Sequence, residues 1–160
     1  MDPQQIVNVP PEIWTLRPAE PDDADAISDV MLEAGAKAWA YLGEELIRTV
    51  NQGVHHPADV VAVDERGEVF AFVAWDNDTG EIVRLFTHPR GWGYGAGQAL
   101  VEAACTALRC AGCKQAWLWT EERNDAVGFY EHAGFRREGE PRIRDWHGAR
   151  LCEPRFARDL

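Results

Sequence analysis

Apolar and polar residues follow two different periods along this chain. Some segments carry apolar residues at the spacing of a helix face, and others alternate or cluster as strands do. The helical segments are 22–38, 44–50, 95–111 and 124–132. In the first of these, Ala26 and Val30, with Ala34 as a further candidate, form the face that we expect to be buried. The segments with strand character are 13–17, 59–64, 68–75, 81–87, 114–120, one beginning at Gly134 and Phe135, and 150–156.

Turn residues separate these segments. The sequences ERG (65–67) and DNDTG (76–80) predict tight links in a three-strand antiparallel meander, and Gly112 predicts a helix end. We expect the last two strands to face each other across a hairpin tipped by 140–149. The order of elements predicts an α/β or α+β mixed fold with a central, mostly antiparallel sheet flanked by about four helices.

The length of the chain bounds its organisation. With 160 residues, 46% of them apolar, it can bury one core but is too short for two ordinary domains. We expect a loose leader over 1–12, which is rich in proline, and one domain over 13–160. No apolar run approaches the roughly 20 residues of a membrane span, and the start lacks the pattern of a signal peptide. A cytoplasmic location without a membrane partner is therefore expected.

The net charge of -11 excludes some partners. Nucleic acid is not expected, because the chain lacks the basic footprint that phosphate backbones need. Residues 1–50 hold ten acids against three bases, which either keeps the protein in solution or forms a rim that attracts a cationic acceptor. The four cysteines suggest neither a disulfide framework nor a metal site, since Cys110 and Cys113 have no second ligand pair.

A glycine-rich stretch, WGYGAGQ, lies between a predicted strand end and a predicted helix start. Unpaired amides at a helix N-terminus attract anions, and glycine lets an oxyanion come close, so the stretch can hold a pyrophosphate. The alternative is that the glycines only allow a tight turn. The P-loop pattern is missing its Gly-Lys-Ser/Thr end, and a dinucleotide fingerprint would belong in a βαβ unit.

A second motif, NDAVGFYEHAGF at 124–135, follows the first by about thirty residues. Together they resemble the GNAT superfamily of N-acetyltransferases, although Trp92 stands where that family usually has Arg or Gln. The matching positions of the second motif are Asn124, Ala126, Phe129, Tyr130, Gly134 and Phe135. The opening sequence, Leu16 to Ala19 followed by Asp22 and Asp23, also looks like the family's first strand and helix start. The resemblance covers nearly the whole chain from Ile13 and implies a GNAT-like domain.

The resemblance also implies a binding site for acetyl-CoA as co-substrate. Backbone groups of Leu85, Phe86 and Thr87 would hold the acyl carbonyl and the pantetheine arm. Asn124 would touch the pantetheine, and Phe129 and Tyr130 would line the thioester end. The pyrophosphate would lie on Trp92, Gly93, Tyr94, Gly95, Ala96, Gly97 and Gln98.

Two residues are the candidates for proton transfer. Tyr130 could protonate the leaving CoA thiolate, whose thiol pKa is near ~8.5, or it could be a core tyrosine. Glu81 lies eleven residues before Trp92, the offset at which histone-type members place a general base. A base is needed because an alkyl amine with a pKa around 10 is mostly protonated at neutral pH; the alternative is a solvated carboxylate. His88 is a back-up base, whereas His55 and His56 are expected to have no specific role.

The acceptor is the least defined part of the prediction. Five aromatic residues could line its pocket or belong to the core: Trp39, Tyr41, Trp75, Trp119 and Trp146. In the family the acceptor cleft involves the first helices, here the acidic segment 22–45, which favours a cationic amine on a small molecule or peptide. A homodimer is left open.

Three functions compete. The first is an N-acetyltransferase that works by direct attack in a ternary complex, since no cysteine is placed for a covalent route. The second is a non-catalytic acyl-CoA-binding or regulatory domain, supported by Trp92. The third is a nucleotide-binding module, which ATP or NAD would stabilise and CoA would not.

Overall fold

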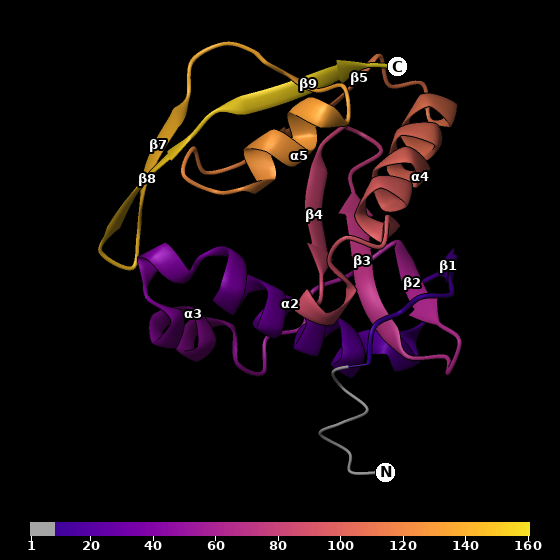
Figure 1. The fold of residues 1–160 in the computed structure, drawn as a ribbon. Helices are drawn as coiled ribbons and strands as arrows, with labels where there is room; N and C mark the ends of the chain where they lie inside the picture. Colours follow the sequence, from indigo (N-terminus) through magenta and orange to yellow (C-terminus); the bar gives the residue numbers. More distant parts are fainter. Residues whose placement is uncertain (1–8) are drawn as a thin grey trace. The chain divides into compact units, whose positions relative to one another are not determined.

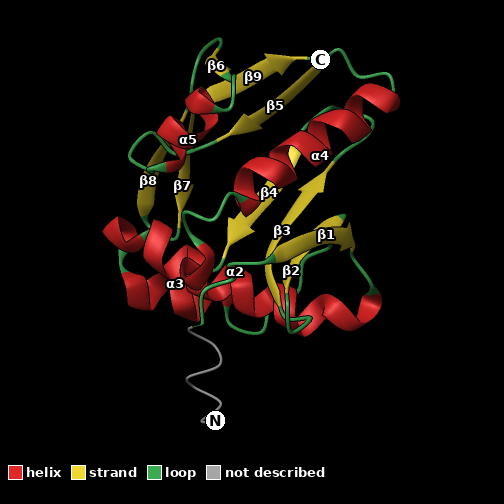
Figure 2. Ribbon diagram, turned by 45° about the vertical axis from the view of Figure 1, so that its right-hand side comes forward, coloured by secondary structure: helices red, strands yellow, loops and turns green. Residues whose placement is uncertain are grey.

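The computed structural model describes residues 9–160 of the chain. These residues form two compact units (Figures 1 and 2). The first unit comprises Met1–Ala74, of which the structure describes 9–74, with Arg84–Ala103; the second comprises Trp75–Val83 with Ala104–Leu160. No helix in the described part is long and apolar enough to cross a membrane.

A four-stranded sheet with the order β1-β2-β3-β4 dominates the first unit. Its strands are β1 (Trp14–Pro18), β2 (Val60–Asp64), β3 (Val69–Trp75) and β4 (Ile82–Thr87), of which Trp75, Ile82 and Val83 are counted with the second unit. Both β1 with β2 and β2 with β3 pair antiparallel, and the second pairing shifts register between Ala62 and Val63. The predicted meander is therefore present.

Two helices, α2 (Ala24–Ala38) and α3 (Glu44–Asn51), lie wholly within the first unit (Figure 2). A 3₁₀ turn, η1 (Pro21–Asp23), leads into α2, and a second, η2 (Ala40–Leu42), precedes α3. The predicted buried face of α2 is correct at Val30 and Ala34, whereas Ala26 is only half-buried. The core residues of α2 that pack with the sheet are Ile27, Val30 and Met31, against Val61 and Phe72.

The second unit contains the remaining strands. A three-stranded antiparallel sheet has the order β5-β9-β6, with β5 at Gln115–Trp119, β6 at Arg136–Arg137 and β9 at Arg155–Asp159. A hairpin of β7 (Arg142–Trp146) and β8 (Ala149–Glu153) and the helix α5 (Ala126–His132) complete it. The helix α4 (Ala96–Cys110) begins in the first unit and ends in the second. One parallel bridge, between Glu81 and Trp117, makes the pairing mixed.

The prediction for the C-terminal strands is wrong in detail. The segment 150–156 is not one strand, because Pro154, which has no N–H to donate, separates β8 from β9. The expected hairpin tip at 140–149 contains β7 instead, and the turn is confined to His147 and Gly148, both at positive φ.

Residues 1–8 of the predicted leader lie outside the described residues. Of the remainder, Val9 accepts a hydrogen bond through its carbonyl from the Arg90 guanidinium at 3.1 Å, and Pro11 is buried beside Gly91.

Candidate functional site

The end of β4 carries the first group of predicted site residues, in the first unit. Leu85, Phe86 and Thr87 are half-buried there, and the Phe86 ring lies 5.9 Å from that of Phe72, between centroids. The Thr87 carbonyl accepts a hydrogen bond from the indole N–H of Trp92 at 2.7 Å. Trp92, the residue that departs from the family pattern, therefore ties the glycine-rich loop (residues 92–98) back to the strand that precedes it.

A 3₁₀ turn, η3 (Pro89–Gly91), connects β4 to the glycine-rich loop. The backbone N–H of His88 donates to the Phe70 carbonyl at 2.7 Å, and the His88 carbonyl accepts from Gly91 at 2.8 Å. Gly91 lies against the Phe70 ring so closely that a Cβ atom would be 2.6 Å from it. The turn is therefore seated on β3 and can be occupied at this position only by glycine without a shift of the ring.

A buried ion pair fixes the same turn. The Arg90 guanidinium donates to Asp64 Oδ2 at 3.0 Å, and the two side chains are only 6% and 2% exposed. The guanidinium also lies 5.4 Å from the centroid of the Phe70 ring. The sequence prediction did not include this pair, because nothing in the sequence separates Asp64 and Arg90 from the charged residues beside them.

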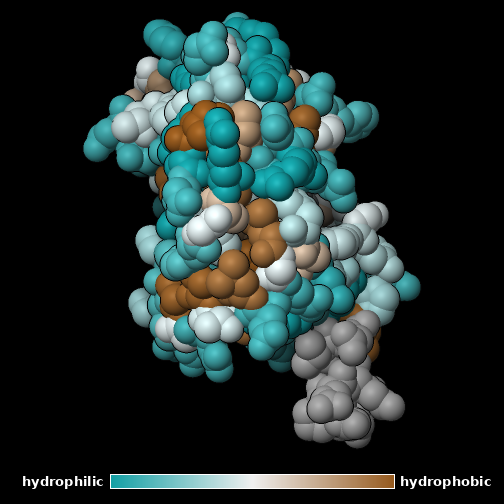
Figure 3. Space-filling view, turned by 90° about the vertical axis from the view of Figure 1, so that its left-hand side faces the viewer, coloured by the Kyte–Doolittle hydropathy of each residue, from teal (hydrophilic) through white to brown (hydrophobic). Residues whose placement is uncertain are grey.

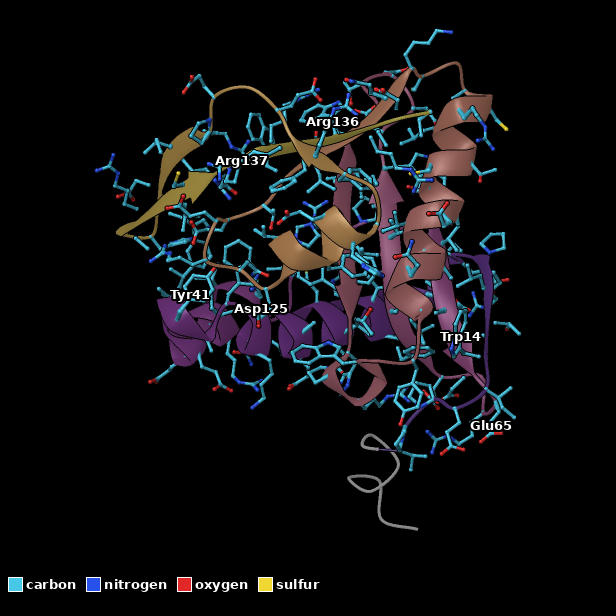
Figure 4. All side chains as sticks on the ribbon, turned by 45° about the horizontal axis from the view of Figure 1, so that its top comes forward. Trp14, Tyr41, Glu65, Asp125, Arg136 and Arg137 are labelled. Carbon is cyan, nitrogen blue, oxygen red and sulfur yellow. The ribbon has the colours of Figure 1, made fainter. Side chains whose placement is uncertain are left out.

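The glycine-rich loop itself has the conformation that close anion approach requires. Gly93 and Gly95 both have φ of 86°, which favours glycine over residues that carry a Cβ. The carbonyl of Tyr94 accepts from the Trp14 indole at 3.0 Å, and Figure 4 labels this tryptophan beside the start of α4. The loop is therefore held on both sides, by Trp92 to β4 and by Trp14 to β1.

The start of α4 places backbone amides beside this loop. The Ala99 N–H donates to the Gly95 carbonyl at 3.1 Å, and the first N–H groups of an α-helix have no acceptor within the helix itself. The helix that follows has 15 residues and no acidic side chain in its first turn, so its positive end is not neutralised. This arrangement fits the pyrophosphate of a CoA molecule.

The second unit holds the other predicted site residues. Asn124 is buried, and its Oδ1 accepts the Ala126 N–H at 2.9 Å, so the side chain caps the start of α5. Tyr130 is 7% exposed and lies between two edge-on rings, Phe129 at 5.1 Å and Phe135 at 5.6 Å. Burial raises the pKa of Tyr130, so its hydroxyl stays protonated at neutral pH.

Glu81 lies directly before β4, at the parallel bridge to Trp117. Its N–H donates to the Thr79 hydroxyl at 3.3 Å, and its carbonyl accepts from Asp76 at 2.8 Å. The Trp117 indole donates to the Thr79 carbonyl at 2.8 Å, and the Trp117 N–H donates to Gly80 at 3.1 Å. The backbone of Glu81 is therefore fixed, and its side chain is half-buried.

Glu121 is a supporting residue that the sequence prediction missed. It is fully buried and accepts from the Arg123 guanidinium and from the backbone N–H groups of Arg123 and Cys152, the latter two at 3.2 Å. Burial alone would raise the pKa of Glu121, but these hydrogen bonds outweigh it and lower the pKa. Its carbonyl accepts from Asn124 at 2.9 Å, so it positions the start of the second motif.

The structure argues against His88 as a base. Its Nδ1 already accepts the Arg90 N–H at 3.1 Å, and its Nε2 is buried. Neither nitrogen can take a proton from a substrate without a movement of the ring.

The acidic segment 22–45 is partly neutralised. Asp23 forms a two-point ion pair with Arg17, and Glu33 and Glu44 both pair with Arg48. Within residues 9–160, no cluster of His, Cys, Asp or Glu side chains could hold a metal ion.

The candidate acceptor aromatics are divided between the two units. Trp39 and Tyr41 belong to the first unit, with ring centroids 6.0 Å apart. Trp75, Trp119 and Trp146 belong to the second, where the Arg142 guanidinium covers Trp119 at 4.7 Å. The face drawn in Figure 3 is mostly hydrophilic, with separate hydrophobic patches.

A glycine-rich loop that leads into a helix, on a mixed α/β fold, is the arrangement that the resemblance in sequence predicted. A family model for the acetyltransferase (GNAT) family matches residues 24–135, most of the chain. This chain belongs to the GNAT family, whose members transfer acetyl groups from acetyl-CoA. Among curated protein sequences, none matches the chain.

Solved structures share the fold. A PaiA N-acetyltransferase from Thermoplasma acidophilum, in complex with coenzyme A, has a TM-score of 0.69 at 16% identity, over 92% of this chain and 99% of its own. A GCN5-related N-acetyltransferase from Rhodopseudomonas palustris has a TM-score of 0.69 at 18% identity, over 91% and 95%. The ribosomal-protein-S18-alanine N-acetyltransferase from Escherichia coli has a TM-score of 0.68 at 22% identity, over 92% and 94%. The predicted fold class and family are confirmed.

Proposed function

We propose that this protein is an N-acetyltransferase that moves the acetyl group of acetyl-CoA to a primary amine of a small molecule or peptide, by direct attack in a ternary complex. The observation that carries the proposal is the glycine-rich loop, with two positive-φ glycines that lead into the N-terminus of α4, in a chain of the GNAT family. The N-acetyltransferases among the similar structures support the choice of an amine acceptor.

The donor would be held mainly by backbone groups. The amides from Trp92 to Gln98 would bind the pyrophosphate, and the backbone of Leu85 to Thr87 would bind the pantetheine arm and the acyl carbonyl. Because these contacts need no cationic side chain, the replacement of Arg or Gln by Trp92 is compatible with binding. In this protein Trp92 bonds to Thr87, which supports a structural role for the replacement.

Two side chains would move protons. Glu81 would accept a proton from the acceptor ammonium, so that the amine lone pair can attack the thioester carbonyl. The carbon–nitrogen bond forms, the carbon–sulfur bond breaks, and Tyr130 would protonate the departing sulfur. The second proton of the amine nitrogen would return to the Tyr130 phenolate, and the proton held by Glu81 would pass to solvent. Tyr130 is protonated at physiological pH, as a proton donor must be, although burial makes its phenol a weaker acid than that of an ordinary tyrosine.

The acceptor would be drawn from cationic amines. Asp22 and Asp29 on the acidic segment are exposed, and their carboxylates support this preference. Asp23 and Glu33 on the same segment are instead paired with arginine side chains.

The proposal is tested by mixing acetyl-CoA with pooled amines, amino acids and peptides and measuring free CoA thiol and acetylated product by mass. Binding is measured in parallel as the rise of the unfolding temperature on addition of CoA. At a CoA concentration a hundredfold above Kd, the expected stabilisation of the folded state is roughly 2.7 kcal/mol. Thiol release with an acetylated amine supports the enzyme. A CoA-dependent shift without turnover on any acceptor would favour the non-catalytic acyl-CoA-binding domain, and a shift with ATP or NAD alone would favour a nucleotide module.

A matched pair of variants tests the loop. Gly95→Val should abolish the CoA shift, because a branched side chain occupies the approach to the amides. Gly67→Val is the control, since Gly67 also has positive φ (80°) but lies in the β2–β3 turn with open space around it. Both variants should lose stability through backbone strain, and only Gly95→Val should lose binding; equal CoA shifts in the two would remove the loop from the site.

A further inference from the structure

His88 stands at the joint between β4 and the glycine-rich loop, yet neither proton transfer nor donor contact accounts for it. It is 7% exposed, and it is the N-cap residue of η3, where its Nδ1 accepts the Arg90 N–H at 3.1 Å. Its Nε2 is buried and has no hydrogen-bond partner among the described residues. A buried nitrogen without a partner destabilises a fold, so a hydrophobic residue would suit the packing better.

The hydrogen bond to Arg90 sets the tautomer of the ring. A nitrogen that accepts an N–H cannot itself carry a proton, so a neutral His88 must hold its proton on Nε2. Protonation at Nδ1 would place two donors against each other, the ring N–H and the Arg90 N–H. The turn η3 is therefore compatible with the neutral imidazole only.

This turn controls the loop that follows it. Only Trp92 separates the end of η3 from Gly93, and the Trp92 N–H itself donates to Pro89 at 3.2 Å. A change at the N-cap would shift the first amides of the loop, and anion binding by several amides depends on their common orientation.

We propose that His88 is a positioning residue for the glycine-rich loop: its neutral ring, bonded through Nδ1 to Arg90, holds η3 in the shape that presents the loop amides to CoA, and protonation of the ring releases the turn and weakens CoA binding. The inference rests on the proposed function for the identity of the ligand.

The charges around the ring favour the neutral form. Burial is the largest effect and lowers the pKa of His88 below its ordinary value, and the Arg90 guanidinium lowers it further. Glu33 and Asp29, both on α2, act in the opposite direction, and Glu33 is itself paired with Arg48. At pH 7 the ring is neutral, and the switch acts only in acid.

Three variants separate the two ring nitrogens. In His88→Asn the side-chain oxygen stands close to the place of Nδ1 and can accept the Arg90 N–H without titrating. In His88→Gln the oxygen reaches toward the place of Nε2, and in His88→Phe there is no acceptor. CoA affinity is measured by calorimetry at pH 7.5 and 5.5, with the unfolding midpoint of each variant recorded at both values.

At pH 7.5 we expect His88→Asn to bind CoA within about threefold of the parent, and His88→Gln and His88→Phe to bind about tenfold more weakly, as for the loss of one hydrogen bond to a buried donor. The CoA phosphomonoester also titrates in this range, with a pKa of ~6, so His88→Asn, which keeps every other titrating group, sets the baseline. Between pH 7.5 and 5.5 the parent should lose more affinity than this variant.

Several results would overturn the inference. Equal affinities of the Asn and Phe variants at pH 7.5, or an equal pH dependence of the parent and the Asn variant, exclude a role for Nδ1. Failure of the parent to bind CoA at either pH rejects the proposed function as well. Nitrogen NMR of the imidazole in the free protein adds a test that no variant can confound: a proton on Nε2 supports the arrangement, and one on Nδ1 contradicts it.

Discussion

Replacing Asp64 by Asn should cost this protein a large part of its stability while leaving the shape of the side chain unchanged. Asp64 Oδ1 accepts the backbone N–H groups of Arg66 at 2.9 Å and Glu68 at 3.0 Å, and an amide oxygen can retain both. Oδ2 binds the guanidinium groups of Arg66 and Arg90 at 3.1 and 3.0 Å. In Asp64→Asn the amide NH₂ replaces Oδ2 and meets these donors, so the buried guanidinium of Arg90 loses its carboxylate.

The magnitude follows from burial. Removing one partner of a buried ion pair costs about 3–5 kcal/mol, because the remaining charge stays out of water. For a chain of this size, 1 kcal/mol corresponds to roughly 2–4 °C, so the unfolding midpoint should fall by about 6–20 °C. Glu33→Gln is the control: Glu33 forms a two-point pair with Arg48, but both side chains are about a third exposed. That change should cost about 0–1 kcal/mol.

The pH dependence supplies a second, independent measure. Burial works to raise the pKa of Asp64, but its hydrogen bonds from Glu68, Arg66 and Arg90 prevail, so the pKa lies below the ordinary value. The carboxylate therefore contributes stability that is fully present above about pH 4 and is lost as the pH falls through the folded-state pKa. The difference in unfolding free energy between parent and Asp64→Asn should be constant from pH 5 to 8 and narrow below about pH 4.

The free energy of unfolding is measured by chemical denaturation for the parent, Asp64→Asn, Arg90→Met and the double variant. These four proteins form a double-mutant cycle for the ion pair. We expect a coupling free energy of about 1–3 kcal/mol. The double variant should therefore lose less stability than the sum of the losses in the two single variants. The reasoning is refuted if Asp64→Asn costs no more than Glu33→Gln, or if the cycle is additive.

Two further predictions concern the proposed catalytic groups. Tyr130→Phe should lower kcat by about 10²- to 10⁴-fold with little change in CoA affinity, measured by steady-state kinetics and calorimetry; a less stable but fully active variant would remove the hydroxyl from the mechanism. Glu81→Gln should slow transfer most at low pH and recover as rising pH supplies free amine, so a full pH–rate profile is needed; an equal loss at every pH would indicate positioning instead of proton abstraction.

The sequence predicts most of the fold correctly in those segments where the pattern of apolar residues matches the buried positions. The helix faces at Val30 and Ala34 and the meander from 59 to 87 lie where the periodicity places them. The hairpin of β7 and β8 was missed because β7, RIRDW, has no buried face. It is held through charges instead: Arg142 and Arg144 both bond across the hairpin to the nearly buried Glu153. Hydrophobic periodicity cannot predict a hairpin that is held by ion pairs.

The candidate site divides in the same way. The glycine-rich loop could be predicted, because positive φ at Gly93 and Gly95 is a local requirement that selects glycine. The residues that support the loop and the second motif could not. Asp64 is buried and Glu65 is exposed, and Glu121 is buried and Glu122 is exposed, although the paired letters are chemically alike. Only the packing around each carboxylate decides whether it is buried and hydrogen-bonded.

These buried polar groups share one property that bears on function. Asp64, His88 and Glu121 each accept at least one backbone N–H and lie close in sequence or in contact with a predicted site segment. Hydrophobic contacts alone would stabilise the fold without fixing the direction of individual amides, whereas a buried acceptor fixes the N–H that it binds. A donor site made of backbone amides needs that direction fixed before the ligand arrives, since reorganisation on binding is subtracted from affinity. Asp64 and His88, which hold the turn before the loop, are therefore as much a part of the proposed CoA site as the glycines that form its surface.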